Sequence, residues 1–292
     1  MQRAPRHPQG ESCAWLQPVP AVLQGALVAV VMRDTRGVSL DDAQRLSHFP
    51  ASPLMSLSWF HGAEVGFMQP DGAWSPFGAD VVVFGSQLTP RVTWAPRTGF
   101  GGMLCFTPDV AQALFGLDPA ALVDGLAPAA AVLDRSWQPW LRALPQATTP
   151  AAAMALITAA LGPRWQVLQG RAGQAPSLRQ VGRAWVGRLA LQALQWRQGR
   201  SPRQVERRLK EWTGRSLRDW QALVRTEGLF FAARDRQAQG LPFDWAGLAQ
   251  DEGFADQAHL VRSARRITGF APGEFARRFV EDESFWIVRL WV

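Results

Sequence analysis

Tyrosine is absent from this 292-residue sequence, and cysteine, lysine and long apolar runs are scarce. The two cysteines, Cys13 and Cys105, are too few for a disulfide framework in a chain of this length. No Cys/His spacing matches a metal site, so we expect neither a metal nor any other cofactor. The apolar run Ala26–Met32 is far shorter than the roughly 18 residues of a membrane-spanning helix, and it follows no basic leader. These absences favour a cytoplasmic protein without a membrane partner.

The usual signatures of catalysis are also missing. There is no Gly-rich phosphate loop, nucleophile elbow or triad pattern. Glu64, Asp71 and Asp80 are not spaced as a carboxylate pair for acid–base chemistry. His48 and His61 lie on expected strands, but a metal site would need more ligands, so we interpret both as ordinary polar residues. We therefore predict no catalytic residue and no enzymatic activity.

The overall composition is that of a globular protein, with 47% apolar and 19% charged residues. The length suggests two domains, each large enough to bury its own core. The 14 Trp and 16 Phe are expected to fill these cores. For Trp59, Trp74 and Trp94 two interpretations stay open, a pocket for an apolar effector or ordinary aromatic core, and we favour the core.

The net charge of +7 is concentrated in the C-terminal part of the chain. Residues 1–150 carry 9 basic and 11 acidic residues, whereas residues 177–292 carry 20 basic and 13 acidic ones. All of the cations in that second part except Lys210 are arginines. A near-neutral part followed by a basic part fits a sensor joined to a DNA binder. The charge alone fits an RNA binder or a partner of acidic proteins equally well.

The first half of the chain has the pattern of a β-rich domain. Residues 1–20 are rich in proline and polar groups and predict a flexible arm. Over residues 21–145, short apolar runs alternate with Gly and Pro, which predicts a β-rich domain, either a sandwich or a small barrel. Helices are expected over 107–116 and from 118. Residues 146–176 predict a linker with one helix that Gly162-Pro163 ends.

From residue 177 onward, helices separated by short turns are predicted. Ser201 is a good N-cap directly before Pro202, and the helix that follows ends at Gly214. A long helix is expected over 216–239 and a short one over 245–251. Further helices are expected over 256–268 and 272–280. Two helix-turn-helix units thus occupy residues 177–281, and we expect the apolar tail 282–292 to pack back onto the protein.

The most specific pattern is GFADQAHLVRSARRITGFAPGEF, Gly253–Phe275. It combines a turn glycine, a following aromatic, an Asp-Gln-x-His run, a basic residue three positions later, then Thr-Gly and a proline. This stretch resembles the signature of the AraC/XylS family of transcription regulators. Leu248-Ala249, Ser201–Gln204 and Trp212–Gly214 also match, so the resemblance covers most of residues 189–280.

The resemblance implies two helix-turn-helix subdomains, each with one recognition helix that enters a major groove of DNA. Arg pairs well with guanine and Gln with adenine. The positions that match the family's base-facing sites are Arg203, Gln204, Arg207, Gln257, Ala258, His259 and Arg262. Phosphate contacts are expected from Arg208, Arg265 and Arg266. For His259, a structural role at the turn is an equally good alternative.

The sequence departs from the family pattern at three places. The first unit has Leu194–Gly199, LQWRQG, where a Leu-Ala-x-x-x-Gly stretch is usual. Ala264 occupies the position of a large aromatic, so another side chain, for example a tryptophan, must fill that core. Ala255 replaces a common hydroxyl cap and leaves Asp256 as the carboxylate at the helix start.

The first half also resembles the cupin-like sensor domain of some regulators in this family, through His48–Pro53, Gly99–Phe106 and Ala113–Leu117. The sequence therefore predicts an α+β protein of two domains that binds promoter DNA sequence-specifically. Its expected partners are double-stranded promoter DNA, with RNA polymerase, a small-molecule effector and a second copy as candidates. We expect it to associate with the nucleoid when bound to DNA. The effector-binding residues are unknown.

Two alternatives stay open at this point. One is a regulator that acts through protein–protein contacts with weakened DNA binding, which the departures in the first unit and at Ala264 favour. The other is a cupin-like enzyme whose basic domain only localises it. A cluster of metal ligands or carboxylates would favour the enzyme, and the sequence lacks one.

Overall fold

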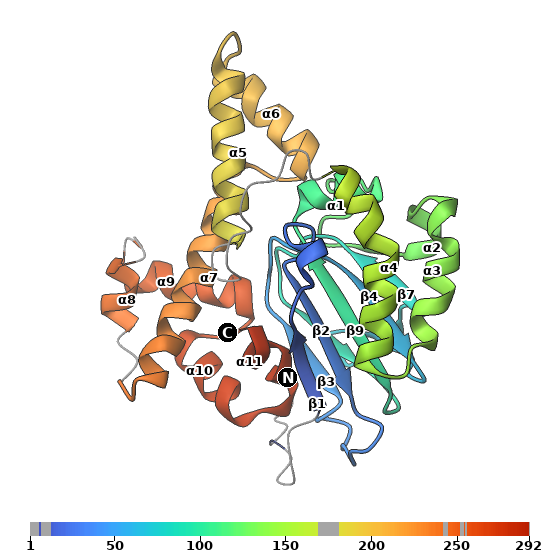
Figure 1. Ribbon diagram of the computed structural model, residues 1–292. Helices are drawn as coiled ribbons and strands as arrows, with labels where there is room; N and C mark the ends of the chain where they lie inside the picture. Colours follow the sequence, from blue (N-terminus) through green and yellow to red (C-terminus); the bar gives the residue numbers. More distant parts are fainter. Residues whose placement is uncertain are drawn as a thin grey trace.

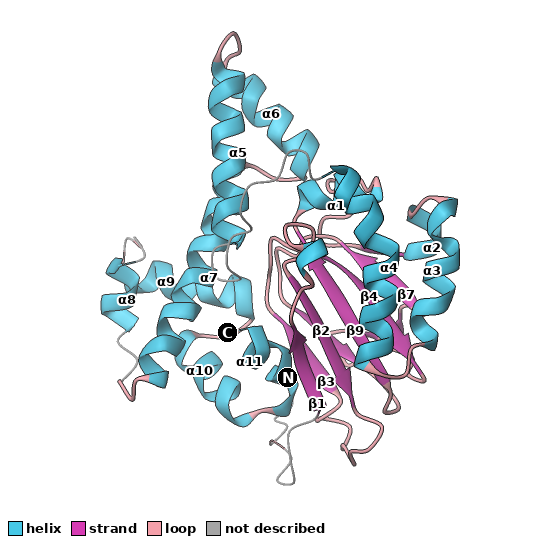
Figure 2. Cartoon of the chain, in the orientation of Figure 1, coloured by secondary structure: helices cyan, strands magenta, loops and turns pink. Residues whose placement is uncertain are grey.

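The computed structural model describes residue 6 and residues 13–168, 181–241, 245–251, 254 and 256–291. Its N-terminal half is built around β-sheets, and the described elements of its C-terminal half are helices, with the two halves side by side (Figures 1 and 2). The predicted fold class, a β-rich domain followed by an all-helical one, is therefore confirmed.

In the part of the chain that the structure describes, ten antiparallel strands form two sheets. The larger sheet has the order β1-β2-β9-β4-β7-β10, and the smaller one has the order β3-β8-β5-β6. The strands are β1 (Cys13–Gln17), β2 (Ala29–Asp34), β3 (Leu46–Phe49), β4 (Met55–His61), β5 (Gly66–Met68), β6 (Trp74–Pro76), β7 (Val81–Phe84), β8 (Arg91–Trp94), β9 (Phe100–Phe106) and β10 (Leu126–Pro128).

Side chains alternate along the larger sheet, which gives it two different faces. On β4, Met55, Leu57 and Trp59 belong to the main core of the first domain. Ser56 and Ser58, between them, line the space on the other face. Because these inner side chains are small, the space between the two sheets is not filled.

Helices of the first domain cover the core face of the larger sheet (Figure 2). They are α1 (Pro108–Phe115), α2 (Ala129–Val132), α3 (Gln138–Ala143) and α4 (Pro150–Leu168). Helix α4 buries Ala153, Ile157, Leu161 and Trp165 in the core, and the Trp165 Nε1–H donates to the Gln24 carbonyl at 3.0 Å. Helix α4 is thus part of the first domain rather than of a linker.

Three predictions for the first half were wrong. The segment predicted as a flexible arm contains β1, which pairs with β2 from Cys13 to Gln17. Residues 119–124 form turns instead of a helix. Helix α4 continues past Gly162 through Pro163 to Leu168, because packing against the sheet offsets the hydrogen bond that a proline removes.

The second half contains the helices that the sequence predicts, as far as its residues are described. They are α5 (Val181–Arg197), α6 (Pro202–Thr213), α7 (Leu217–Ala238), α8 (Trp245–Asp251), α9 (Gln257–Thr268) and α10 (Pro272–Glu281). Ser201 and Gln204 form a capping box at the start of α6. Asp256 accepts from the His259 N–H at the start of α9. Gly214 and Gly269 end these two helices with positive φ, as expected for C-terminal glycines.

The long helix α7 joins two apolar clusters. One cluster packs α5 and α6 on α7 through Trp185, Leu209 and Trp220. The other packs α9 and α10 on α7 through Phe230, Leu260 and Phe275. Both clusters include a residue of the first domain, Ala51 in one and Val31 in the other.

The C-terminal tail packs back as predicted, with Phe285 and Ile287 buried. It forms a short turn of helix and then α11 (Trp286–Trp291), which contacts β1 and β3 (Figure 1). No helix of the described residues is both long and apolar enough to cross a membrane.

Candidate DNA-binding helices and the cavity between the domains

Helix α6 exposes the polar face that the sequence predicts. Val205 and Leu209 are buried, whereas all four predicted contact residues, Arg203, Gln204, Arg207 and Arg208, are exposed. The Arg207 Nε lies 3.6 Å from a carboxylate oxygen of Glu211, and the Arg208 guanidinium lies 4.4 Å from the centre of the Trp196 ring.

Helix α9 is organised in the same way. Leu260, Ala264 and Ile267 are buried. The exposed predicted contact residues are Gln257, Ala258, Arg262, Arg265 and Arg266. His259 is half-buried, and its ring contacts Phe254 edge-on at 5.4 Å between centroids. Gly253 and Ala255 lie outside the described residues.

Phenylalanines surround Ala264 and compensate for its small size. Phe230, Phe254, Phe275 and Phe285 all belong to its apolar cluster. Trp245 and Trp286 are only partly buried against this cluster. Phe285 comes from the C-terminal tail, so residues beyond α10 complete this apolar cluster.

Helix α5 is continuous to Arg197, and the residues on its buried face do not include every leucine of the helix. Ala193 is buried, whereas the following Leu194 is 57% exposed and Leu191 is 62% exposed. These two leucines leave an apolar face of α5 in solvent.

Both candidate recognition helices contact the first domain near their C-terminal ends. After α6, the Arg215 guanidinium lies 3.3 Å from an Asp124 carboxylate oxygen. Within α6, the Trp212 Nε1–H donates to the Gln112 side chain on α1 at 3.0 Å. The N-terminal half of α6, which carries Arg203 and Gln204, points away from these contacts.

At the end of α9, the contact is made by His48 on β3. The His48 Nε2 lies 2.7 Å from the Thr268 carbonyl oxygen, and the Ala51 N–H donates to the Ile267 carbonyl at 2.8 Å. Burial lowers the pKa of His48 to about 4, so the ring is neutral at physiological pH. Because a carbonyl only accepts, Nε2 carries the proton. The sequence did not show this role of His48, since its partner lies 220 residues away.

The C-terminal tail adds a buried ion pair between the two halves. The Arg33 Nη2 on β2 donates to Glu283 Oε1 at 2.9 Å, and the guanidinium lies 4.7 Å from the Trp286 ring centre. The Trp286 Nε1–H donates to the Ser47 hydroxyl at 2.8 Å. Burial lowers the pKa of Arg33 to about 10, although Glu283 opposes the shift. The tail is therefore held firmly on the β domain.

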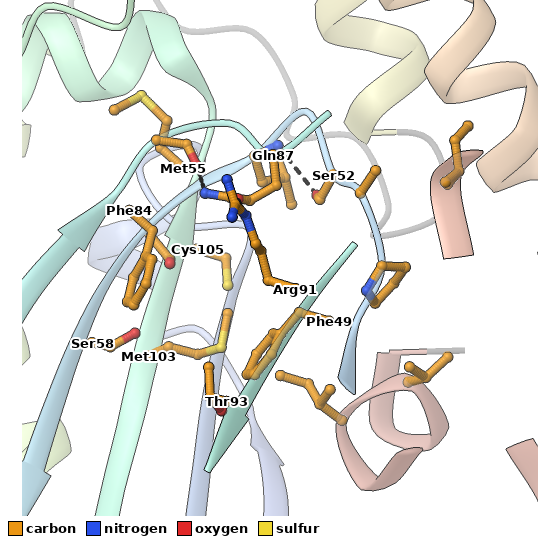
Figure 3. Close-up of a pocket in the computed structure, with 18 of the residues that line it drawn as sticks. Phe49, Ser52, Met55, Ser58, Phe84, Gln87, Arg91, Thr93, Met103 and Cys105 are labelled. Carbon is orange, nitrogen blue, oxygen red and sulfur yellow. Dashed lines mark hydrogen bonds between the residues drawn. The ribbon is translucent and has the colours of Figure 1, made fainter. Parts of the chain in front are cut away.

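A cavity of about 180 Å³ lies where the inner sheet faces meet the helical domain (Figure 3). From the β domain, Phe49, Phe84, Met103 and Thr93 face into it (Figure 3). Residues of the helical domain and the tail complete the wall, namely Glu227, Phe230, Phe231, Ile267, Thr268, Phe275, Ile287 and Val288. Most of these side chains are apolar, which suits an apolar ligand.

A second cavity continues between the two sheets. It shares six lining residues with the first, namely Phe49, Ser58, Phe60, Val65, Thr93 and Met103. Its far part is lined by Arg33, Arg45, Arg97 and Trp94. Of the three tryptophans considered above, Trp94 thus lines a cavity and Trp59 is core. Trp74 contacts Trp94, donating from Nε1 to its carbonyl at 3.2 Å.

The other residues that the sequence analysis considered make contacts within the first domain or lie in its interior. The His61 Nδ1 lies 2.7 Å from the Pro145 carbonyl oxygen, whereas His48 binds the Thr268 carbonyl. Cys105 is buried as predicted, and burial raises the pKa of its thiol. No group of three or more potential metal ligands occurs among the residues that the structure describes.

Comparison with known proteins gives no family assignment. The sequence matches no protein family model and no curated protein significantly. Among solved structures, the chain is similar to ToxT from Vibrio cholerae O395, with 8% identity, a TM-score of 0.37, and 81% of this chain and 97% of that chain covered. An apo ToxT variant from Vibrio cholerae strain SCE256 gives 11% identity, a TM-score of 0.42, and coverages of 85% and 96%. Likenesses this weak carry no argument about function.

Proposed function

We propose that this chain is a DNA-binding transcription regulator of the AraC type and not an enzyme. The observation that carries the proposal is the pair of capped helices α6 and α9. Each buries an apolar stripe in its own cluster and exposes arginine and glutamine side chains. A recognition helix needs this combination of a docked apolar face and an outer face that can enter a groove.

The exposed positions suggest two kinds of contact with DNA, one to bases and one to phosphates. Arg203, Gln204 and Arg207 on α6 would read bases at one site. Gln257, Ala258, His259 and Arg262 would do so on α9. Arg265 and Arg266 lie farther toward the C-terminal end of α9 and would contact phosphates. Arg208 stacks on Trp196, so its guanidinium is held in a fixed place from which it could contact the backbone.

The two functional domains would meet between α4 and α5, since α4 belongs to the first core. The β domain would act as sensor, because it holds the C-terminal ends of both recognition helices through Asp124, Gln112 and His48. A small-molecule effector in the cavity would contact α7, the end of α9 and the tail at once. Such a ligand could change the relative placement of the two helices. We extend the proposal to promoter DNA in the nucleoid as the target, and to RNA polymerase and a second copy as candidate partners.

The test is binding of the full chain to a preferred DNA site. Arg262→Ala should cost about 1–3 kcal/mol and relax specificity at one base pair. Arg266→Ala should weaken binding to all sequences about equally. Arg142 is exposed on α3 in the first domain, so Arg142→Ala is a matched control that should change nothing. If Arg262→Ala left binding to the preferred site unchanged, the role of α9 would be wrong.

One observation favours the alternative, a regulator that works through protein contacts. Leu191 and Leu194 on α5 are more than half exposed, which is unusual for large apolar side chains so close together. Under this alternative, Leu191→Ser with Leu194→Ser would abolish regulation while leaving DNA affinity intact. Loss of DNA affinity in Arg262→Ala, with normal regulation in the leucine variant, would reject it.

A further inference from the structure

Glu227 occupies an unusual place in the cavity between the domains. It lies in the middle of α7 and lines the cavity. Its carboxylate rests against α5, because a β-carbon added to Gly182 would come within 2.7 Å of Glu227 Oε2. Pro53 of the first domain approaches the same spot. The carboxylate thus lies at the junction of α5, α7 and the β domain.

This carboxylate lacks a hydrogen-bond partner within the described part of the chain. Among the described residues, no N–H or O–H group donates to it, and the charge that lowers its pKa is that of Arg183 on α5. Burial raises its pKa to about 7. A carboxylate without donors in an apolar surrounding costs stability, so packing does not account for its presence.

The other charged group in the cavity wall is already engaged. The Arg91 Nη2 donates to the Asp124 carbonyl at 2.9 Å, and its Nε lies 3.4 Å from the Gln87 side-chain oxygen. The guanidinium also lies over the Phe67 ring at 5.3 Å. Within the described part of the chain, therefore, Glu227 is the charged cavity-lining residue for which no hydrogen bond is found.

We propose that the cavity binds an apolar molecule that carries a hydrogen-bond donor, an amine or a hydroxyl group, and that the Glu227 carboxyl accepts from this donor. The apolar part of the ligand would lie against Phe84, Phe230 and Ile287. The inference rests on the proposed function only where it assigns this ligand the role of effector. Since α7 joins both helix-turn-helix units, a ligand anchored on Glu227 reaches both of them through one helix.

Three octyl compounds test the donor requirement with the full chain: octylamine, octanol and octanoate, each below its micellar concentration. Their binding is followed by intrinsic tryptophan fluorescence and thermal unfolding, without DNA. We expect octanol and octylamine to bind wild type at least about tenfold more tightly than they bind Glu227→Leu. Octanoate should bind weakly to wild type, because its carboxylate would face Glu227. Glu64 is exposed, so Glu64→Gln serves as the control and should match wild type.

The pH dependence separates the two donors. Octylamine should bind more tightly as the pH rises from about 6 to about 8, because Glu227 then ionises beside a cationic amine. Octanol binding should change little over this range. Glu227→Gln keeps an acceptor oxygen and no charge, so it should retain octanol and lose octylamine. If Glu227→Leu fails to fold, Glu227→Gln still tests the proposal through this difference between octanol and octylamine.

Three results would overturn the inference: equal binding of all probes to wild type and to Glu227→Leu, tight binding of octanoate, or no binding of either donor compound to wild type. DNA affinity is measured separately. Failure of wild type to bind DNA would refute the proposed function and leave the ligand site standing.

Discussion

Glu227 gives the sharpest prediction about stability, because no donor to its half-buried carboxyl is found among the residues that the structure describes. Its pKa is raised from 4.5 to about 7 in the folded protein, whereas the unfolded chain has the ordinary value. The folded state therefore holds a proton that the unfolded state releases between these two pH values. The free energy of unfolding falls as the pH rises through this range, and the full penalty is present above about pH 7.

The size of the penalty follows from the shift. At 1.36 kcal/mol per unit, the upper limit is about 3 kcal/mol. The cavity leaves the side chain half-buried, so we expect about 1–3 kcal/mol. Glu227→Gln removes the ionisation and should stabilise the protein by this amount at about pH 8, with little change at about pH 4.5.

Urea unfolding of wild type, Glu227→Gln and the control Glu64→Gln over this pH range measures the effect. We expect the unfolding midpoints of Glu227→Gln to exceed those of wild type increasingly as the pH rises. Glu64→Gln should follow wild type at every pH. If Glu227→Gln were less stable than wild type at about pH 8, the carboxylate would have a strong partner and the reasoning would fail.

Two further predictions concern the contacts between the domains. His48→Ala removes the donor to the Thr268 carbonyl and the stack on Phe285, and should lower the free energy of unfolding by about 1–3 kcal/mol at neutral pH. Because the folded-state pKa of His48 is lowered to about 4, its contribution is present above about pH 6.5 and lost as the pH falls toward 4. The variant should lack this pH dependence in acid unfolding curves, and an unchanged curve would contradict the assignment. Arg33→Met removes the guanidinium at 2.9 Å from Glu283, whereas Arg289 stays at 3.6 Å, and should cost about 3 kcal/mol in urea unfolding. The double variant with Glu283→Gln should recover part of this loss, and additive losses would show that the pair is not coupled.

Local sequence signals predicted the helices of the second domain well. Ser201, Asp256, Gly214 and Gly269 act on their own helix ends, so neighbours along the chain suffice to place the boundaries. The exposure of the α6 and α9 polar faces followed from the apolar period in the same way. The prediction for α4 failed because Pro163 is tolerated through packing on the sheet, which local rules do not contain.

Features that depend on distant contacts could not be predicted. The segment of β1 was predicted as part of an arm, because its pairing with β2 depends on a separate segment of the chain and has no local sequence signal. His48 looked like an ordinary polar residue, although it binds the end of α9. Glu227 gave no signal, since an unpaired carboxylate is visible only once the cavity around it is known.

Binding of the full chain to DNA tests the central claim most directly. Duplexes from the region upstream of its own coding sequence and shuffled duplexes of equal length would be titrated between about 50 and 200 mM salt. We predict that affinity for both falls steeply with salt while a preference for one native duplex persists, and that Arg262→Ala reduces this preference. Equal and weak binding to native and shuffled DNA, unchanged in Arg262→Ala, would show that α6 and α9 do not read DNA.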